Sequence, residues 1–158
     1  GRSAEQALEI MRDSRIGAHG AVALILAFAA RITLLAALSP LAAAGALALG
    51  MAIGRAAILP VVALERPARP DGLARLIARP DGGHGFYPRD ILALAATLAL
   101  AVGMAGIAGV LALGLGASCA LLVGRFARAR LGGITGDVLG AAAVLAEIAA
   151  IAALVGLR

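Results

Sequence analysis

The stretch that decides the fold is residues 91–124, ILALAATLALAVGMAGIAGVLALGLGASCALLVG, which carries no charged side chain. Its 34 residues would measure about 50 Å as one α-helix, whereas the hydrocarbon of a bilayer is roughly 30 Å thick. We therefore expect two membrane spans here, with a turn between Gly103 and Gly109. This pattern is typical of a polytopic helical membrane protein.

Three further apolar runs are long enough to cross a bilayer as helices. They predict spans at residues 18–38, 41–64 and 135–157, so that we expect an all-α fold of about five transmembrane helices. We place all of them in one integral-membrane domain, residues 1–158. The composition agrees, since 62% of residues are hydrophobic, only 3% are aromatic and the mean hydropathy is +1.00. The apolar residues are mostly small or aliphatic, with many alanines and 21 glycines, and small side chains let helices approach closely in lipid.

Polar residues gather in the segments outside these runs. Residues 1–17 predict an amphipathic helix, in which Ser3 and Gln6 fit an N-terminal capping box. Residues 65–90 form a long polar loop, whose middle part, residues 73–79, predicts a short helix lying on the membrane surface.

The distribution of arginine predicts the orientation of the chain. All 14 basic residues are arginines, and most lie in the N-terminal segment, in loop 65–90 and in a second loop at residues 125–134. The connections near Ser39 and Gly106 carry none. Because basic residues accumulate on the cytoplasmic side, we expect the N-terminus and both loops in the cytoplasm and Arg158 outside. A net charge of +5 arranged in this way argues against a nucleic-acid partner.

Two polar stretches stand at the mouths of apolar runs, where charged groups are costly unless they are used. They read LEIMRDSRIG at residues 8–17 and GGITGDVLG at residues 132–140. Together, in this order, they resemble the cobalamin synthase family (adenosylcobinamide-GDP ribazoletransferase). The chain is similar to the C-terminal portion of such an enzyme, and the family's N-terminal Asp-Gly segment, thought to hold metal, has no counterpart here.

The resemblance implies a transferase that joins adenosylcobinamide-GDP to α-ribazole, or to its 5′-phosphate, with release of GMP. Phosphoryl transfer of this kind depends on positioning and on charge stabilisation, which Mg²⁺ and arginine supply. The implied setting is the bacterial cytoplasmic (inner) membrane, with the lipid bilayer and both substrates as partners. A homo-oligomer is compatible with the sequence. Because the Asp-Gly segment is missing, we expect the 158-residue chain alone to be inactive.

In the first motif, Asp13 is our candidate for a catalytic carboxylate and Mg²⁺ ligand, because Mg²⁺ prefers carboxylate and phosphate oxygens. We assign Arg15 a catalytic role and Arg12 a substrate-binding role, since a guanidinium can grip phosphate. On a helix, Asp13 and Arg15 would point to different sides, so we expect no direct neutralisation between them. The alternative is a solvated charge cluster that flanks the membrane.

In the second motif, Asp137 stands at the start of a predicted span, where a carboxylate needs a metal, an arginine or water. We expect Asp137 to be catalytic and, with Asp13, to hold Mg²⁺. Gly133, Thr135 and Gly136 are assigned to substrate binding, because glycines let a backbone approach a ligand and a helix start offers N–H groups to an anion. The alternative for Thr135 is a helix cap.

Two arginines fall inside predicted spans. Arg55 lies about 15 Å from the cytoplasmic end of its span, and we expect it to bind substrate or to pair with Asp137 or Glu147. The alternative is that Arg55 snorkels to the surface, although the distance is long for one side chain. Arg31 lies nearer the outer end of its span, and we expect it to snorkel to the surface.

The long loop supplies Arg66 and Arg69, which we assign to the diphosphate of the substrate; a topology signal alone is the alternative. Two other protein classes stay open. One is another Mg-dependent membrane phosphotransferase, such as a CDP-alcohol phosphotransferase, although its full signature is not found. The other is a transporter or structural membrane subunit, in which Arg55, Asp137 and Glu147 would line a pathway or hold helices together.

Overall fold

The computed structural model describes residues 3–13, 15–70, 74 and 85–157. These residues are mostly helical, and their β structure is limited to one isolated bridge. The helices are α1 (Ala4–Ile10), α2 (Ala18–Ala36), α3 (Pro40–Ala56), α4 (Ile58–Leu64), α6 (Pro88–Leu131) and α7 (Gly136–Gly156). Four helical stretches are long and apolar enough to cross a membrane: α2, α3 together with α4, α6, and α7.

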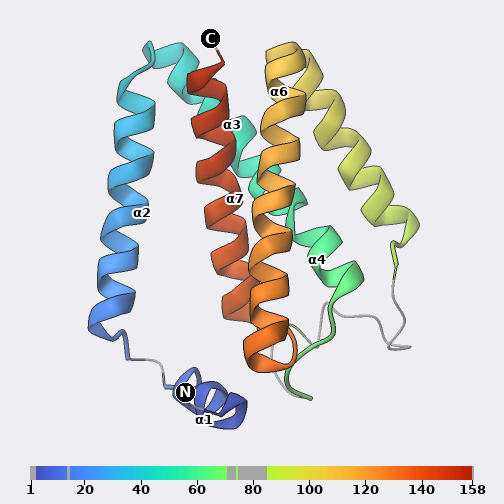
Figure 1. Cartoon of the computed structure of the whole chain (residues 1–158). Coiled ribbons are helices and arrows are strands. Elements are labelled where there is room, and N and C mark those ends of the chain that lie inside the picture. The colour runs from blue at the N-terminus through green and yellow to red at the C-terminus, as the bar shows by residue number, and fades with distance from the viewer. Residues whose placement is uncertain (1–2, 14, 71–73, 75–84, 158) are drawn as a thin grey trace.

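The longest helix, α6, is a helical hairpin. Gly106 interrupts it with φ 55° and ψ −131°, in the left-handed half of the Ramachandran map that glycine adopts without strain. Beyond the turn the two limbs nearly touch, because a Cβ at Gly109 would collide with the carbonyl oxygen of Ala101. Figure 1 shows the limbs diverging from this turn. The predicted division of residues 91–124 is confirmed, because Gly106 turns this apolar segment back on itself.

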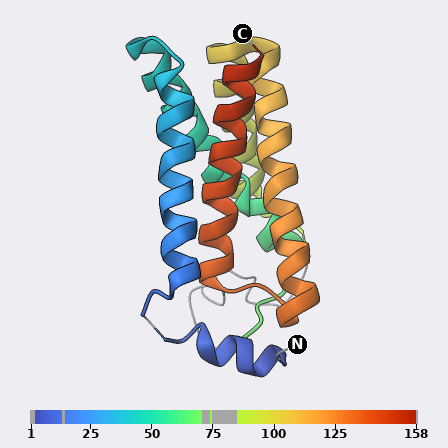
Figure 2. The ribbon, with the colours of Figure 1, turned by 60° about the vertical axis from the view of Figure 1, so that its left-hand side comes forward.

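The central helix is α7, which contacts α2, α3, α4 and α6 (Figures 1 and 2). Its alanines are its contact surface, and Ala142, Ala146 and Ala150 are fully buried. Glycines on neighbouring helices allow this close approach. A Cβ at Gly50 of α3 would lie 2.6 Å from Ile151, and a Cβ at Gly116 of α6 would lie 3.1 Å from the carbonyl oxygen of Ala146.

The second span consists of two helices in sequence. α3 ends at Ala56, Ala57 caps it, and α4 continues from Ile58. Pro60 explains the break, because it has no N–H to bond the carbonyl oxygen of Ala56 four residues earlier. The apolar run predicted at residues 41–64 is therefore helical, with a break at Ala57.

The predicted helix at residues 1–17 is wrong in its length. α1 ends at Ile10, and Met11 caps it. Its start is as predicted: Ser3 Oγ accepts from the Gln6 N–H at 3.2 Å, and Gln6 Oε1 accepts from the Ser3 N–H at 3.1 Å. α1 lies across one end of the bundle (Figure 2). The surface helix expected at residues 73–79 falls outside the described residues, apart from Ala74.

Candidate functional site

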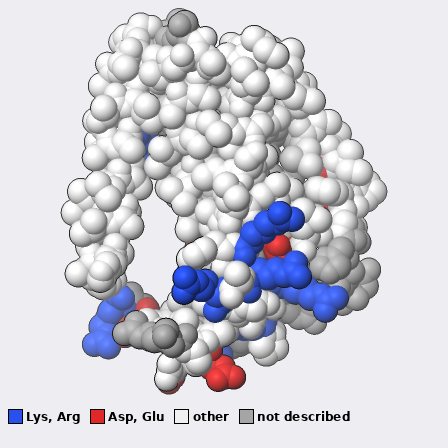
Figure 3. Space-filling view, in the orientation of Figure 1, with Lys and Arg blue, Asp and Glu red and all other residues white. Residues whose placement is uncertain are grey.

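Both sequence motifs and the first part of the long loop lie at one end of the bundle, which we call the motif end. It holds α1, residues 65–70 and the turn from α6 into α7 (Figure 1), and the C-terminus of α7 lies at the opposite end. Arginines gather on the surface of the motif end (Figure 3). The fold therefore brings together segments that are far apart in the sequence. This agrees with the expectation that both motifs and the long loop lie on the same side of the membrane.

A short backbone pairing joins the long loop to the second motif. Pro67 and Ile134 form a parallel bridge, in which Ala68 N–H donates to Ile134 O and Ile134 N–H donates to Arg66 O, both at 2.8 Å. Gly133 makes the approach feasible, since a Cβ there would collide with Arg66 O and lie 2.8 Å from the Ala68 nitrogen. The structure thus gives Gly133 a packing role, and substrate contact by Gly133 stays a prediction.

The second motif turns the chain from α6 into α7. Gly132 ends α6 with a positive φ of 76°, a common helix terminator. Thr135 is buried and its side chain accepts a hydrogen bond from Val138 N–H at 3.3 Å, so it caps α7. The capping alternative for Thr135 is what the structure shows. Gly136 is half-buried in the first turn of α7, and the Asp137 side chain next to it is exposed.

Arg69 ties the long loop to α1. Its Nη2 donates to the carbonyl oxygen of Leu8 at 2.7 Å. The neighbouring Nε of Arg69 is buried, and within the described part of the chain it has no hydrogen-bond partner. A buried cationic donor without an acceptor is costly, so this atom favours an additional acceptor such as an anionic oxygen. Arg66, by contrast, is exposed.

Asp13 and Arg15 form an exposed ion pair. Arg15 Nη2 lies 2.7 Å from Asp13 Oδ2, Arg15 Nε contacts both carboxylate oxygens, and the Arg15 backbone N–H donates to Oδ1 at 3.0 Å. The expectation that these two side chains point apart is wrong, because α1 ends at Ile10 and the segment that follows turns them together. The Arg15 guanidinium, followed by the Arg15 N–H, lowers the pKa of Asp13, and the pKa of Arg15 is raised in turn.

The first motif also borders a shallow hollow of about 440 Å³, lined by Gln6, Glu9, Ile10 and Asp13. Glu9 was not among the predicted site residues. In the sequence, Glu9 lies four residues before Asp13. This spacing places two side chains on the same face only where the helix is continuous. The hollow thus has two carboxylates on its wall.

The described residues contain no group of three or more His, Cys, Asp or Glu side chains arranged to hold a metal ion. Mg²⁺, however, is commonly held by one or two carboxylates together with substrate phosphates and water. Asp13 and Asp137, both exposed at the motif end, fit that kind of incomplete donor set. Metal binding by these two residues stays a prediction.

The intramembrane charges pair differently from the sequence expectation. Arg31 Nε of α2 lies 2.8 Å from Glu147 Oε1 of α7, so Arg31 does not snorkel to the surface and Glu147 does not pair with Arg55. The Arg55 side chain is exposed on α3. The reason is depth, since α2 and α7 both start at the motif end and place Arg31 and Glu147 at similar heights.

A second acidic residue is buried near the motif end. Glu65 caps the end of α4 and is 8% exposed, and its Oε2 lies 3.7 Å from Arg128 Nη1 of α6. Glu65 was not among the predicted site residues. Its position in the sequence could have indicated a buried ion pair, because Glu65 directly follows an apolar run and the segment around Arg128 is basic.

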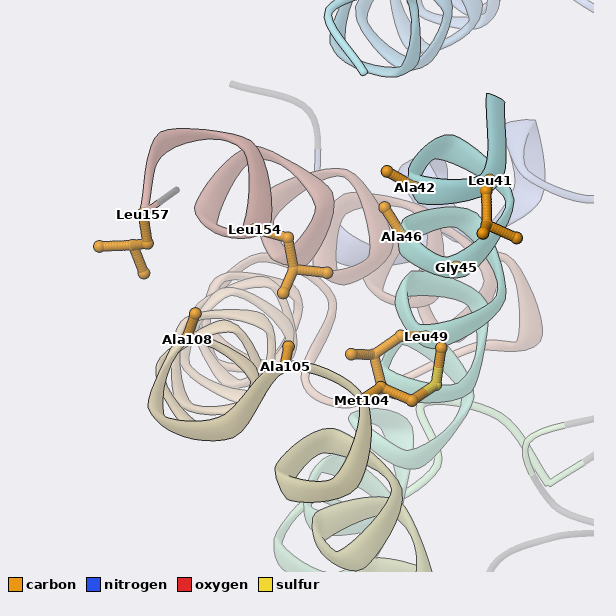
Figure 4. A pocket seen from close by; sticks show the side chains of 10 residues that line it. All are labelled: Leu41, Ala42, Gly45, Ala46, Leu49, Met104, Ala105, Ala108, Leu154 and Leu157. Carbon is orange, nitrogen blue, oxygen red and sulfur yellow. The ribbon is translucent and has the colours of Figure 1, made fainter. Parts of the chain in front are cut away.

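At the opposite end of the bundle, the described residues form an apolar pocket. Side chains of α3, α6 and α7 point into a cavity of about 410 Å³ (Figure 4). It is lined by Leu41, Ala42, Gly45, Ala46, Leu49, Met104, Ala105, Ala108, Leu154 and Leu157. None of these side chains can act as an acid, base or phosphate ligand, so the candidate site is the motif end.

The fold and the motif end define a multi-pass helical membrane protein with a basic, glycine-containing site at one end of its bundle. Residues 1–155 match the family described as cobalamin-5-phosphate synthase, and the chain belongs to this family. This confirms the resemblance seen in the two motifs. No solved structure matches the chain significantly.

The chain is similar to several proteins named adenosylcobinamide-GDP ribazoletransferase. It is 41% identical to the one from Bradyrhizobium diazoefficiens over 149 residues, which cover 94% of this chain and 56% of that protein. It is 40% identical to the one from Sinorhizobium medicae over 164 residues, covering 98% and 61%. A relative from Roseiflexus sp. is 42% identical over 159 residues, covering 97% and 55%. The chain thus spans somewhat over half the length of these relatives.

Proposed function

We propose that this chain forms the membrane-embedded, phosphate-binding part of an adenosylcobinamide-GDP ribazoletransferase. The reaction joins adenosylcobinamide-GDP to α-ribazole, or to its 5′-phosphate, and yields adenosylcobalamin, or its phosphate, and GMP. The observation that carries the proposal is the backbone bridge between Pro67 and Ile134, which holds an arginine-containing loop against the second motif at the end of the bundle where the first motif also lies. Family membership supports the same chemistry.

The arginines of the motif end are suited to a diphosphate. Arg69 Nε is a buried donor in need of an acceptor. Arg66 is exposed, and its carbonyl oxygen accepts a hydrogen bond from Ile134 N–H of the second motif. The N-terminus of α7, a helix of 21 residues, adds a positive dipole beside them. These groups would bind the diphosphate of the substrate and hold in position the P–O bond to its bridging oxygen, which breaks when GMP leaves.

The exposed carboxylates Asp13 and Asp137 are the proposed Mg²⁺ ligands. Bound Mg²⁺ would neutralise charge that develops on the diphosphate oxygens. Arg15 lowers the pKa of Asp13, so this carboxylate is ionised at neutral pH, and Mg²⁺ would share its oxygens with Arg15 or displace it. Arg12 and Arg55 remain proposed substrate contacts.

We place the motif end in the cytoplasm of a bacterium and the spans in its inner membrane. The arginine-rich segments lie at this end, as the positive-inside rule requires of a cytoplasmic face. Nucleotide substrates are present on that side.

The test is a turnover assay with the chain joined to the additional sequence of the Bradyrhizobium relative and reconstituted in liposomes. GMP release is measured with Mg²⁺, α-ribazole and adenosylcobinamide-GDP, and in parallel with a CDP-linked alcohol that would release CMP. We expect GMP and cobalamin only. CMP release would indicate a CDP-alcohol phosphotransferase, and substrate movement across sealed vesicles without turnover would indicate a transporter.

A further inference from the structure

An ion pair lies inside the membrane-spanning part of the bundle, away from the proposed site. Arg31 of α2 and Glu147 of α7 are joined by a contact of 2.8 Å, and their side chains are 22% and 5% exposed. Buried charges are costly to desolvate, and breaking such a pair leaves an uncompensated charge. A pair at this position is therefore expected to have a function.

The surroundings of the pair direct both side chains toward each other. The Arg31 guanidinium lies 5.9 Å from the centre of the Phe28 ring on the same helix face. Behind Glu147, α3 approaches so closely that a Cβ at Gly54 would lie 3.1 Å from the Glu147 Cβ and 2.6 Å from the carbonyl oxygen of Ala143. The backbone of α3 thus closes one side of Glu147, and its carboxylate extends to α2.

α2 depends on this contact more than the other spans do. None of its residues is buried, whereas nearly half of the apolar window of α7 is buried. Figure 3 shows open space between α2 and the rest of the molecule over the half nearer the motif end. The Arg31–Glu147 contact is a side-chain hydrogen bond and ion pair that joins α2 to α7.

We propose that Arg31 and Glu147 are positioning residues, which together fix α2 against α7 and so set the distance between the two motifs. α2 begins directly after the first motif, α7 begins at Gly136 within the second, and both helices start at the same end of the bundle. The position of α2 therefore decides where the segment with Asp13 and Arg15 lies relative to Asp137. The effect on turnover rests on the proposed function, whereas the effect on helix position does not.

The experiment measures the distance between spin labels at the motif ends of α2 and α7 in the full chain in lipid nanodiscs. The labels are attached to His19→Cys and Gly140→Cys, both at exposed positions, with Cys119→Ala removing the native thiol. We expect a single distance peak with the native ion pair. Arg31→Gln or Glu147→Gln should broaden it and move it to longer distances, and the exchange of Arg31→Glu with Glu147→Arg should restore it.

Two controls separate positioning from a loss of the fold. Arg55→Gln removes an exposed charge from α3 and should leave the α2–α7 distance unchanged. A second label pair, Met51→Cys and Leu145→Cys, reports on α3 against α7 and should be unchanged in every variant. An unchanged α2–α7 distance in both single variants would overturn the proposal. So would an equal change in the α3–α7 distance, or failure of the exchanged pair to restore the peak while the α3–α7 distance stays intact.

Turnover in the joined protein gives the second readout. Misplacing one motif should lower kcat by about 10- to 100-fold, because small errors of position are costly in phosphoryl transfer, and should leave KM nearly unchanged. The exchanged pair should recover kcat. If the distance responds as predicted but no variant has turnover, including the native pair, the proposed function fails and the positioning role stands.

Discussion

The backbone N–H of Ala68 donates a hydrogen bond to the carbonyl oxygen of Ile134 at 2.8 Å. With the reciprocal bond from Ile134 N–H to Arg66 O, it makes one unit of two segments that are far apart in the chain. The arginines of the loop and the carboxylate of Asp137 are thereby kept at the same end of the bundle. The integrity of this unit is directly testable.

Gly133→Ala should break this unit. The added Cβ would collide with Arg66 O and crowd the Ala68 nitrogen, both backbone atoms that cannot rotate away. We expect a loss of about 1–3 kcal/mol in stability, measured by thermal unfolding with a thiol-reactive dye that reports on Cys119. Gly140→Ala is the matched control, since nothing lies within 4 Å of its Cβ. Equal melting temperatures for the two variants would contradict this role of Gly133.

Arg69→Ala should release α1 from the loop. The change removes the hydrogen bond from Nη2 to Leu8 O, which we expect to contribute about 1–2 kcal/mol. Amide hydrogen exchange in residues 3–11 should then be about tenfold faster. Arg125→Ala, an exposed arginine of α6, should leave this exchange unaltered. Unaltered exchange in Arg69→Ala as well would show that α1 is held by other contacts.

Asp13 should titrate below its ordinary range because Arg15 stabilises the carboxylate. A lowered pKa in the folded state means that the ion pair is complete above the unfolded-state value of about 3.9 and is lost as the pH falls through the folded-state pKa. Asp13 should therefore stay ionised between about pH 5 and pH 8. Carbonyl ¹³C shifts of Asp13 should show a higher midpoint in Arg15→Gln, and identical midpoints would refute the pairing.

Gly54→Leu should disrupt the contact between α3 and α7. A Cβ at this position would lie 2.6 Å from the carbonyl oxygen of Ala143, so a larger side chain forces the helices apart. We expect destabilisation of about 2–4 kcal/mol. Gly114→Leu on α6 meets no atom within 4 Å of its Cβ and serves as the control in the same thermal assay. Similar melting curves would mean that α3 can shift without cost.

The architecture was largely predictable from the sequence because hydrophobic length limits what a helix can do in a bilayer. Residues 91–124 are too long for one span, and Gly106 provides the turn that this length requires. The capping box of Ser3 and Gln6 was equally visible, since it depends on local spacing alone. Local rules therefore located the helices. The loop expected at residues 125–134 is wrong over most of its length, because α6 continues to Leu131 and ends at Gly132.

The contacts between helices were less predictable. Nothing in the sequence marks the end of α1 at Ile10, so the pairing of Asp13 with Arg15 was missed. The pairing of Arg31 with Glu147 follows from their equal depth in two parallel spans, which a count of residues from the motif end would have revealed. No periodic pattern in the sequence predicts the bridge between Pro67 and Ile134. Gly133 is the residue that hints at it, because a glycine allows another backbone to approach closely.

The most direct test of the account is turnover of the joined protein in liposomes with and without the Asp137 carboxylate. GMP and cobalamin are followed for the native sequence, for Asp137→Asn and for Glu5→Gln, an exposed carboxylate at the start of α1. The 158-residue chain by itself is assayed beside them and should show no turnover. The account predicts product from the native sequence and from Glu5→Gln, and a loss of at least about 100-fold in Asp137→Asn. Full activity of Asp137→Asn, or no product from any folded variant, would contradict it.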